Sequence, residues 1–226
     1  MGILIVTGTG TEIGKTHVSE AILLCEGRGR SVLGYKPVES GTAPGSPTAD
    51  SARLAAASSF HVKHPPAFRF DAPVSPHLAA RLEGTPIDIS VIREKIRELT
   101  LQVDLLLVEL AGGLFSPLTD DRANADLVRA IEEEHPSAKT LLIAPDRLGV
   151  LHDVAATALA AETRGARLDA IVLNAPELAD ASTGTNMREL SLVTPIPVLG
   201  VASRTRPPAM ADSAVIRYIS SILLHF

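Results

Sequence analysis

The chain has few of the residues that mark several common classes of protein. Of its 226 residues, one is cysteine, none is tryptophan and 3% are aromatic. A single cysteine excludes an intrachain disulfide and a zinc site built from cysteines. Cys25 lies in an apolar helical run, which favours a buried structural thiol over a reactive one. So few aromatic side chains argue against a stacking platform for sugars or single-stranded nucleic acid.

Long apolar runs and an excess of basic residues are also missing. No run approaches the ~18 apolar residues of a membrane-spanning helix, and the first residues lack the basic lead of a signal peptide. Lysine and arginine number 21 against 26 aspartates and glutamates, for a net charge of −5. We therefore expect a cytoplasmic protein with no general attraction to nucleic acid or to anionic membranes.

The hydrophobic pattern predicts strands that alternate with helices. Short apolar runs predict strands at 2–7, 31–37, 103–110, 138–144, 168–174 and 195–201. Helical spacing predicts helices at 16–27, 88–100, 123–134, 150–164 and 213–224, and a Gly/Pro/Ser-rich stretch predicts a loop at 39–50. Such alternation is typical of a parallel sheet covered on both faces. We expect one α/β domain over residues 1–226, a three-layer sandwich with a mostly parallel central sheet.

The turn between the first strand and the first helix carries the sequence TGTGTEIGKTH, residues 7–17. Its Gly-Lys-Thr ending is that of a phosphate-binding loop. The usual spacing of that loop puts a glycine at position 9, which here is Thr9, with Gly8 and Gly10 on either side. The turn is therefore either a phosphate loop of different spacing, a dinucleotide-binding turn or a glycine-rich turn without a ligand.

The phosphate loop is the interpretation that we favour, together with the fold of the P-loop NTPases. In it, the helix N-terminus faces an anion, Lys15 reaches the outer phosphates and the Thr16 hydroxyl holds Mg²⁺. A dinucleotide site would have an acid about 20 residues further on, at the end of the second strand. The sequence there is GYKP, with no acid, although Lys36 could suit a 2′-phosphate.

An acidic residue ends another predicted strand, in the sequence LLLVE at 105–109. A carboxylate at the carboxyl end of a strand near a phosphate loop is where Mg²⁺ or its water is held. Ala111, Gly112 and Gly113 follow Glu109 closely, and this backbone allows a ligand to approach. The alternative for Glu109 is a solvated strand end.

Four segments together resemble the dethiobiotin synthetase family over nearly the whole chain. They are TGTGTEIGKT, GYKPVESG, VSPH and VELAGGLFSPL, in this order and at these distances. The family's loop has five residues between its first glycine and Gly-Lys-Thr, as Gly8 to Gly14 has here. The resemblance implies that ATP and Mg²⁺ are used to carboxylate 7,8-diaminononanoate with CO₂ and to close a ring, giving dethiobiotin, ADP and phosphate. It also implies a homodimer.

The resemblance implies roles for individual residues. It assigns Lys15, Lys36 and Ser40 to catalysis, and Thr11, Glu12 and Ser40 to the substrate. It assigns Gly8, Glu12, Ile13, Gly14, Lys15, Thr16, His17 and Asn174 to the nucleotide, with Asn174 at the adenine. It assigns Thr16, Asp50 and Glu109 to Mg²⁺.

Three of these assignments have simpler alternatives. Lys36, expected at the end of the second strand and beside the first, could be a solvated strand-end lysine. Asp50 precedes a helix-like run and could be an N-cap. Asn174 could be a turn residue before Pro176. His77, in the family's Ser-Pro-His segment, is expected at a helix start and not in catalysis.

The chain departs from the family pattern at four places. It has Gly10 where the family usually has an acid, Leu110 where it has a glycine, and His152-Asp153 in place of Asn-His. Its last loop reads Gly200-Val-Ala-Ser-Arg204.

These departures leave open a related ATP-dependent carboxylate-activating ligase that acts on another substrate. A nucleotide-switched binding protein of the ParA/MinD kind is disfavoured. Members of that class carry an extra lysine near the start of the loop, and no lysine precedes Lys15.

Overall fold

Among the described residues, the central sheet has six strands, and every neighbouring pair runs parallel. The computed structural model describes residues 1–43, 45–202 and 221. The strands are β1 (Gly2–Gly8), β2 (Val32–Tyr35), β5 (Leu105–Glu109), β6 (Lys139–Pro145), β7 (Ala170–Asn174) and β8 (Val198–Ala202), and their spatial order is β2-β5-β1-β6-β7-β8. The prediction of a parallel α/β sheet is confirmed.

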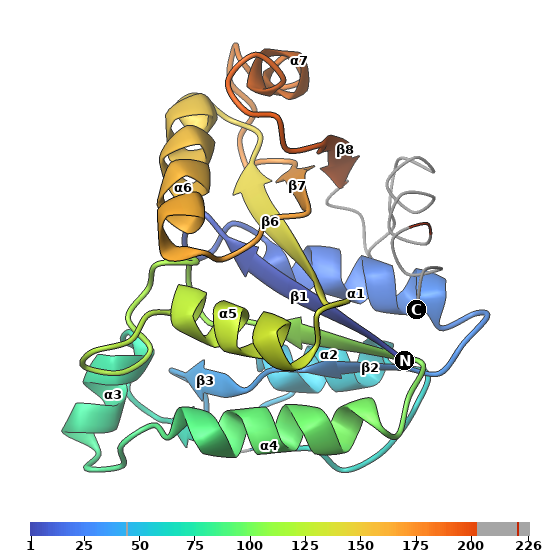
Figure 1. Ribbon diagram of the computed structural model, residues 1–226, viewed down its shortest axis with the longest axis vertical. Helices are drawn as coiled ribbons and strands as arrows, with labels where there is room; N and C mark the ends of the chain where they lie inside the picture. The colour runs from blue at the N-terminus through green and yellow to red at the C-terminus, as the bar shows by residue number, and fades with distance from the viewer. Residues whose placement is uncertain (44, 203–220, 222–226) are drawn as a thin grey trace.

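Helices cover both faces of this sheet (Figure 1). One face carries α1 (Lys15–Glu26) and α2 (Asp50–Ala57), and the other carries α4 (Ile89–Thr100), α5 (Asn124–Glu134) and α6 (Val150–Arg164). Strand β5 shows why its sequence is almost wholly apolar. Leu105 and Leu107 pack in the core beneath α1, while Leu106 and Val108 pack in the core beneath α4 and α5. A strand buried on both faces needs apolar residues at every position.

Several short elements lie outside the predicted pattern. A two-stranded parallel sheet joins β3 (Val38–Ser40) to β4 (Phe68–Phe70), so the predicted loop at 39–50 is wrong in its first residues. The helices α3 (Pro76–Leu82) and α7 (Asn186–Leu190) are also short. Cys25 is partly exposed, which contradicts the buried thiol expected for it. The helix predicted at 213–224 lies outside the described residues.

The strand order corrects the expected position of Lys36. This residue follows β2, and β5 separates β2 from β1, so Lys36 does not lie beside the first strand. A second strand next to the first is the order of dinucleotide-binding folds, and its absence here counts against that interpretation of the turn. Val6 lies opposite Glu109, and Tyr35 opposite Val108, so the ends of three strands and the residues after them meet at one edge of the sheet.

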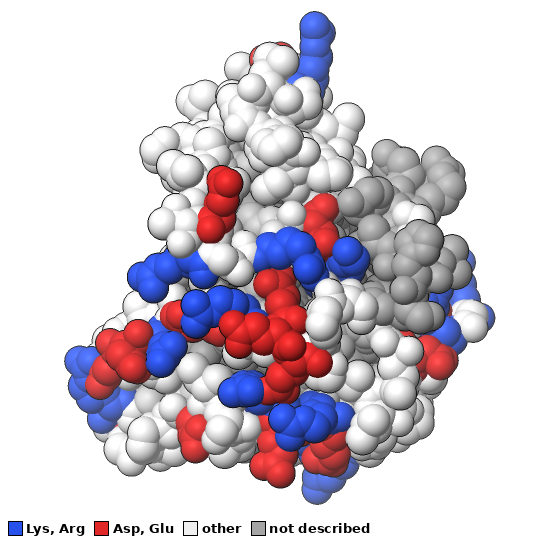
Figure 2. Space-filling model, viewed as in Figure 1, with Lys and Arg blue, Asp and Glu red and all other residues white. Residues whose placement is uncertain are grey.

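Charged side chains of both signs intermingle on the face shown in Figure 2. Over α4 and α5, Glu134 pairs with both Arg93 and Arg97, and Lys95 pairs with Glu98. In the described part of the chain, no helix combines the length and the apolar character needed to cross a membrane.

Candidate active site

The glycine-rich turn is shaped by two glycines that have no room for a side chain. At Gly8, the end of β1, a Cβ atom would lie 2.3 Å from Cδ1 of Ile13. At Gly14, the N-cap of α1, φ is +88° and a Cβ atom would lie 1.9 Å from Nδ2 of Asn174. Since Gly14 has no side chain to cap the helix, the N–H groups of the first turn of α1 are presented to an anion.

A cavity of about 490 Å³ opens beside this turn. Its wall includes most of the residues assigned from the sequence, namely Thr11, Glu12, Gly14, Lys15, Thr16, His17, Lys36, Ser40, Asp50 and Asn174. The remaining three lie behind the wall. Glu109 is fully buried, Ile13 is 8% exposed, and Gly8 supports the base of the turn. The fold therefore brings together residues from five separate segments of the sequence.

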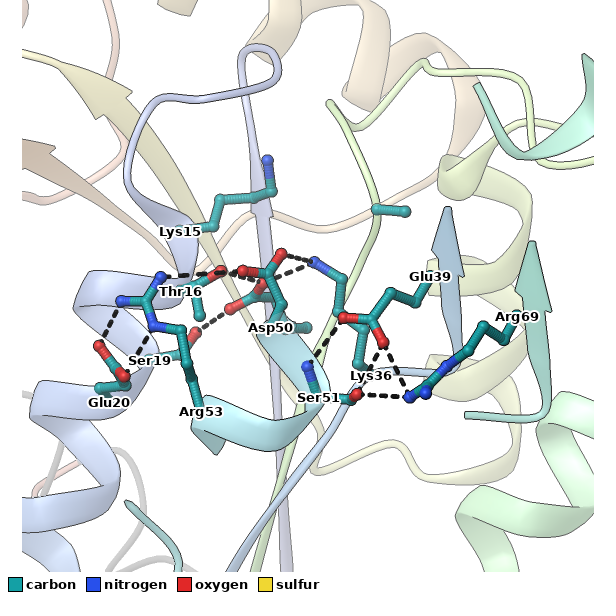
Figure 3. Close-up of polar contacts among 12 residues, drawn as sticks. Lys15, Thr16, Ser19, Glu20, Lys36, Glu39, Asp50, Ser51, Arg53 and Arg69 are labelled. Atoms are coloured by element: carbon teal, nitrogen blue, oxygen red, sulfur yellow. Dashed lines mark hydrogen bonds and ion pairs between the residues drawn. The ribbon is translucent and has the colours of Figure 1, made fainter. Parts of the chain in front are cut away.

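A buried carboxylate stands at the centre of the polar cluster. Glu109 accepts hydrogen bonds from the hydroxyls of Thr16 and Ser19, both at 2.7 Å. Lys36 Nζ donates to Glu109 Oε1 and to Asp50 Oδ2, both at 2.8 Å. Figure 3 shows Lys36 pointing toward Asp50, which comes from the start of α2. The solvated strand-end alternatives for Glu109 and Lys36 are wrong, because both side chains are buried and paired.

The pairing sets the charges of this cluster. Burial on its own lowers the pKa of Lys36, but the carboxylates of Glu109 and Asp50 outweigh it and raise that pKa above its usual value. Burial on its own raises the pKa of Asp50, and the Lys36 ammonium outweighs it and lowers that pKa. Lys36 is therefore charged, and so is Asp50, throughout the neutral pH range.

The oxygen atoms around the Lys36 ammonium fit a magnesium site. Thr16, Asp50 and Glu109 offer one hydroxyl and two carboxylates, which are the hard ligands that Mg²⁺ prefers. Two of these groups already hold a cation, the ammonium of Lys36. Among the described residues, no group of three His, Cys, Asp or Glu side chains forms a metal cage. A sparse set of this kind is typical of Mg²⁺ that is also bound by substrate phosphates.

Asp50 is the first residue of α2, and Ala49 occupies the N-cap position. The N-cap alternative for Asp50 is therefore wrong. Its carboxylate is directed to Lys36 instead.

The second lysine of the site stands apart from this cluster. Lys15 Nζ donates to the carbonyl oxygen of Gly10 at 2.9 Å, and Figure 3 shows no hydrogen bond between Lys15 and the other residues drawn. Burial, and then the nearby charge of Lys36, lower the pKa of Lys15 from 10.5 to about 8. Of the two lysines in the site, Lys15 is therefore the one that loses its proton more readily.

In metal-free buffer, ADP binding should weaken as the pH rises above about 8. Below that pH, Lys15 already carries its proton in the free protein, so binding takes up none. Above it, a bound phosphate raises the pKa of Lys15, and the complex must take up a proton that the free protein lacks. The Kd should then rise by up to about tenfold per pH unit. Calorimetry across the pH range checks this.

The control for this measurement is Lys15→Arg. A guanidinium stays protonated at these pH values, so this variant should show a Kd independent of pH. A flat profile in the wild type would contradict the lowered pKa of Lys15.

Two other assigned residues have partners that bear on their roles. Ser40 lines the cavity, and its Oγ donates to the carbonyl oxygen of Val74 at 2.7 Å. Asn174, the last residue of β7, donates from Nδ2 to the carbonyl oxygen of Ile13 at 2.9 Å. Its Oδ1 is buried without a partner in the described structure. An unpartnered acceptor at the cavity wall suits the exocyclic amine of adenine.

Comparison with known proteins places the chain in a family. Residues 3–206 match a family model described as an AAA domain. An ATP-dependent dethiobiotin synthetase from Caulobacter sp. (strain K31) is 42% identical over 79% of this chain and 80% of its own length. Another from Anaeromyxobacter sp. (strain Fw109-5) is 39% identical over 84% of this chain and 85% of its own length. The chain belongs to the dethiobiotin synthetase family.

Solved structures of P-loop proteins share the fold. The ParA family ATPase from Chlorobium tepidum TLS superposes with a TM-score of 0.54 over 98% of this chain and 87% of its own. Its sequence is only 12% identical, so the likeness shows the fold alone. It confirms the P-loop NTPase fold that was expected for this member of the dethiobiotin synthetase family.

The departures from the dethiobiotin synthetase pattern fall at residues that do not line the cavity, although Gly10 lies in the turn beside it and accepts from Lys15. A Cβ atom on Gly10 would meet no heavy atom within 4 Å, so the fold does not require glycine there. Leu110 is buried in the core, and His152 and Asp153 lie in the first turn of α6. None of these four residues lines the cavity. Of the altered last loop, Ser203 and Arg204 lie outside the described residues.

Three residues of this dethiobiotin synthetase family site were not foreseen from the sequence. Ser19 donates a hydrogen bond to Glu109. It lies one helical turn after Thr16, and this spacing could have indicated that both side chains point to the same site. Arg53 lines the cavity one turn after Asp50, and Glu20 holds it with two hydrogen bonds of 2.9 and 2.6 Å. Glu39 also lines the cavity, from the strand β3 that the pattern did not predict.

Proposed function

We propose that this chain is an ATP-dependent dethiobiotin synthetase, which closes the ureido ring of dethiobiotin from 7,8-diaminononanoate, CO₂ and ATP. One observation carries the proposal. Lys15, Lys36 and the set Thr16, Asp50 and Glu109 converge on a single cavity, in a chain that belongs to this family. We also propose a cytoplasmic homodimer without nucleic-acid or membrane partners.

The reaction brings two anions together. One amine of the substrate adds to CO₂ and loses a proton, which gives a carbamate. A carbamate oxygen then attacks the γ-phosphorus, ADP leaves, and a carbamic–phosphoric anhydride forms. The second amine attacks the anhydride carbon, loses a proton, closes the ring and expels phosphate. Since carbamate and γ-phosphate repel one another, positive charge must be held between them.

The residues of the cavity supply this charge and hold the reactants. Mg²⁺, when held by Thr16, Asp50 and Glu109, neutralises phosphate charge and aligns the nucleotide. Lys15 reaches the outer phosphates, and Lys36, which pairs with the metal ligands Asp50 and Glu109, adds a second positive charge at the cavity wall.

We assign the recognition of the substrates to other parts of the wall. Thr11 and Glu12 lie in the middle of the glycine-rich turn, where Glu12 can accept from an amine. Ser40 faces the carbamate or the phosphate. The first turn of α1, from Gly14 to His17, holds the phosphates, and Asn174 holds adenine.

A coupled assay tests the proposed function. Purified protein should release phosphate only when diaminononanoate, bicarbonate, ATP and Mg²⁺ are all present, and mass spectrometry should find dethiobiotin in equal amount. Omitting each component in turn is the control. Phosphate release that does not depend on the diamine would overturn the proposal.

A second candidate is an ATP-dependent ligase of the same family that activates a different acid. It is favoured by the open space at Gly10 and by His152-Asp153 at the start of α6. Normal nucleotide binding with no turnover of diaminononanoate, and turnover of another amino acid-like substrate in a screen, would support it.

A further inference from the structure

A second buried carboxylate, Glu39, lies beside the cluster around Lys36. Glu39 is 3% exposed. It lies in the short strand β3, a few positions after β2. Glu39 Oε1 accepts from the backbone N–H of Ser51 at 3.0 Å, and Oε2 accepts from the Ser51 hydroxyl at 2.6 Å. Arg69, from β4, donates to Oε2 of Glu39 at 3.1 Å and to the Ser51 hydroxyl at 2.9 Å. The charge of Glu39 is thus fully engaged inside the protein.

The partner of Glu39 is the residue next to a metal ligand. The N–H group that donates to Glu39 belongs to the peptide bond between Asp50 and Ser51. Figure 3 shows Glu39, Ser51 and Arg69 on one side of the start of α2, and Arg53 with Glu20 on the other. A carboxylate that accepts an N–H in the first turn of a helix also interacts favourably with the helix dipole. The start of α2 is therefore anchored to the small sheet by Glu39.

We propose that Glu39 is a positioning residue that fixes the Asp50 carboxylate for Mg²⁺. The inference rests on the proposed function for its metal, and it assigns to Glu39 an effect on metal binding that goes beyond stability. Groups that orient a metal ligand through a hydrogen bond commonly change metal affinity by about 10- to 100-fold when they are removed. Glu39 also directly precedes Ser40 in β3, so the residue that anchors the start of α2 is the neighbour of a proposed substrate-binding residue.

The geometry explains why removal of the Glu39 carboxylate would change the orientation of the Asp50 carboxylate. Asp50 is 37% exposed at its side chain, and its carboxylate interacts with the side chains of Lys36, Arg53 and Thr16. Lys36 pairs with the carboxylate that would also hold Mg²⁺, so the metal and the ammonium would share this group. The backbone anchor through Ser51 does not involve that carboxylate, so Mg²⁺ binding at Asp50 would not compete with it.

The test is Glu39→Gln, with binding measured in place of turnover. ADP affinity is determined by calorimetry with Mg²⁺ and with EDTA, and the ratio of the two Kd values reports the metal-dependent gain. We expect the ratio to fall about tenfold in the variant, because the amide removes the charge that holds Ser51 and Arg69. ADP affinity in EDTA should stay within about twofold of wild type, since Glu39 contributes nothing to the phosphate turn.

Two further variants keep the test decisive. Glu134→Gln removes an ion pair between α5 and α4, away from the cavity, and should keep the wild-type ratio. Ser51→Ala removes the hydroxyl contacts but leaves Glu39 paired with Arg69, and should lower the ratio by about threefold. If Glu39→Gln does not fold, Ser51→Ala decides.

The outcomes separate this inference from the proposed function. A wild-type ratio in both Glu39→Gln and Ser51→Ala would overturn it, whatever their melting temperatures. A wild-type protein whose ADP affinity does not respond to Mg²⁺ would also overturn it. A protein that binds Mg²⁺ and ADP as described but makes no dethiobiotin would fail the proposed function and leave the role of Glu39 intact.

Discussion

Lys36→Met should lower the rate of dethiobiotin formation by about a thousandfold, the upper range for removing one charge that stabilises a transition state. It should also lower the free energy of unfolding by roughly 3–5 kcal/mol, because a buried carboxylate, Glu109, is left without its cation. Methionine matches the length of lysine and cannot donate to either carboxylate. Phosphate release at saturating substrates and urea unfolding measure the two effects.

Magnesium offers a direct check on the cause of this instability. If the variant is unstable because Glu109 and Asp50 repel one another, Mg²⁺ should raise its melting temperature more than that of the wild type. The matched control is Lys139→Met, which breaks the pair with Asp169 at the opposite end of the sheet. That pair is partly exposed, so its loss should cost no more than about 1 kcal/mol and leave the rate unchanged. A wild-type rate in Lys36→Met would remove Lys36 from the chemistry.

The sheet could be predicted because its signals are local. Each central strand is a short run of apolar residues, and Gly-Lys-Thr opens a helix directly after the first of them. The strand order could not be predicted in the same way, since nothing local to β2 says that β5 will lie between it and β1. The contact of Lys36 with Glu109 spans 73 residues and depends on that order. The family resemblance supplied the two residues, and the fold supplied their pairing.

Glu39 and Arg53 show where the sequence was uninformative. Strand β3 has three residues, too few to show a period of two, and it begins a stretch rich in glycine and proline. Its hydrogen-bonding partner, the short strand β4, is separated from it by 27 residues and follows α2. Without that pairing there is no reason to place Glu39 against Ser51. Polar networks assembled from several short elements depend on tertiary contacts, and local propensity does not encode them.

Glu109→Gln should lower the rate about as strongly as Lys36→Met, by 100- to 1,000-fold (about 3–4 kcal/mol), with a much smaller loss of stability. The amide keeps the shape of the side chain and still accepts through its oxygen from Thr16 and Lys36. Lys36 keeps Asp50 as its counter-charge, so no buried charge is left alone. The variant should also need more Mg²⁺ for half-maximal rate, since one of two carboxylates is gone. Steady-state kinetics against Mg²⁺ and urea unfolding test these expectations.

The double variant Lys36→Met/Glu109→Gln separates the two roles of the pair. Removing both charges leaves no buried carboxylate without a partner, so the double variant should be more stable than Lys36→Met alone by about 1–3 kcal/mol. Its rate should nevertheless stay at the level of the worse single variant, because the reaction needs both a cation and a metal ligand at this position. If the double variant loses the sum of the unfolding free energies lost by the two single variants, Lys36 and Glu109 are not coupled in the folded protein. A rate that recovers along with the stability would show that both single variants had failed through misfolding, and the catalytic assignment of Lys36 and Glu109 would then be wrong.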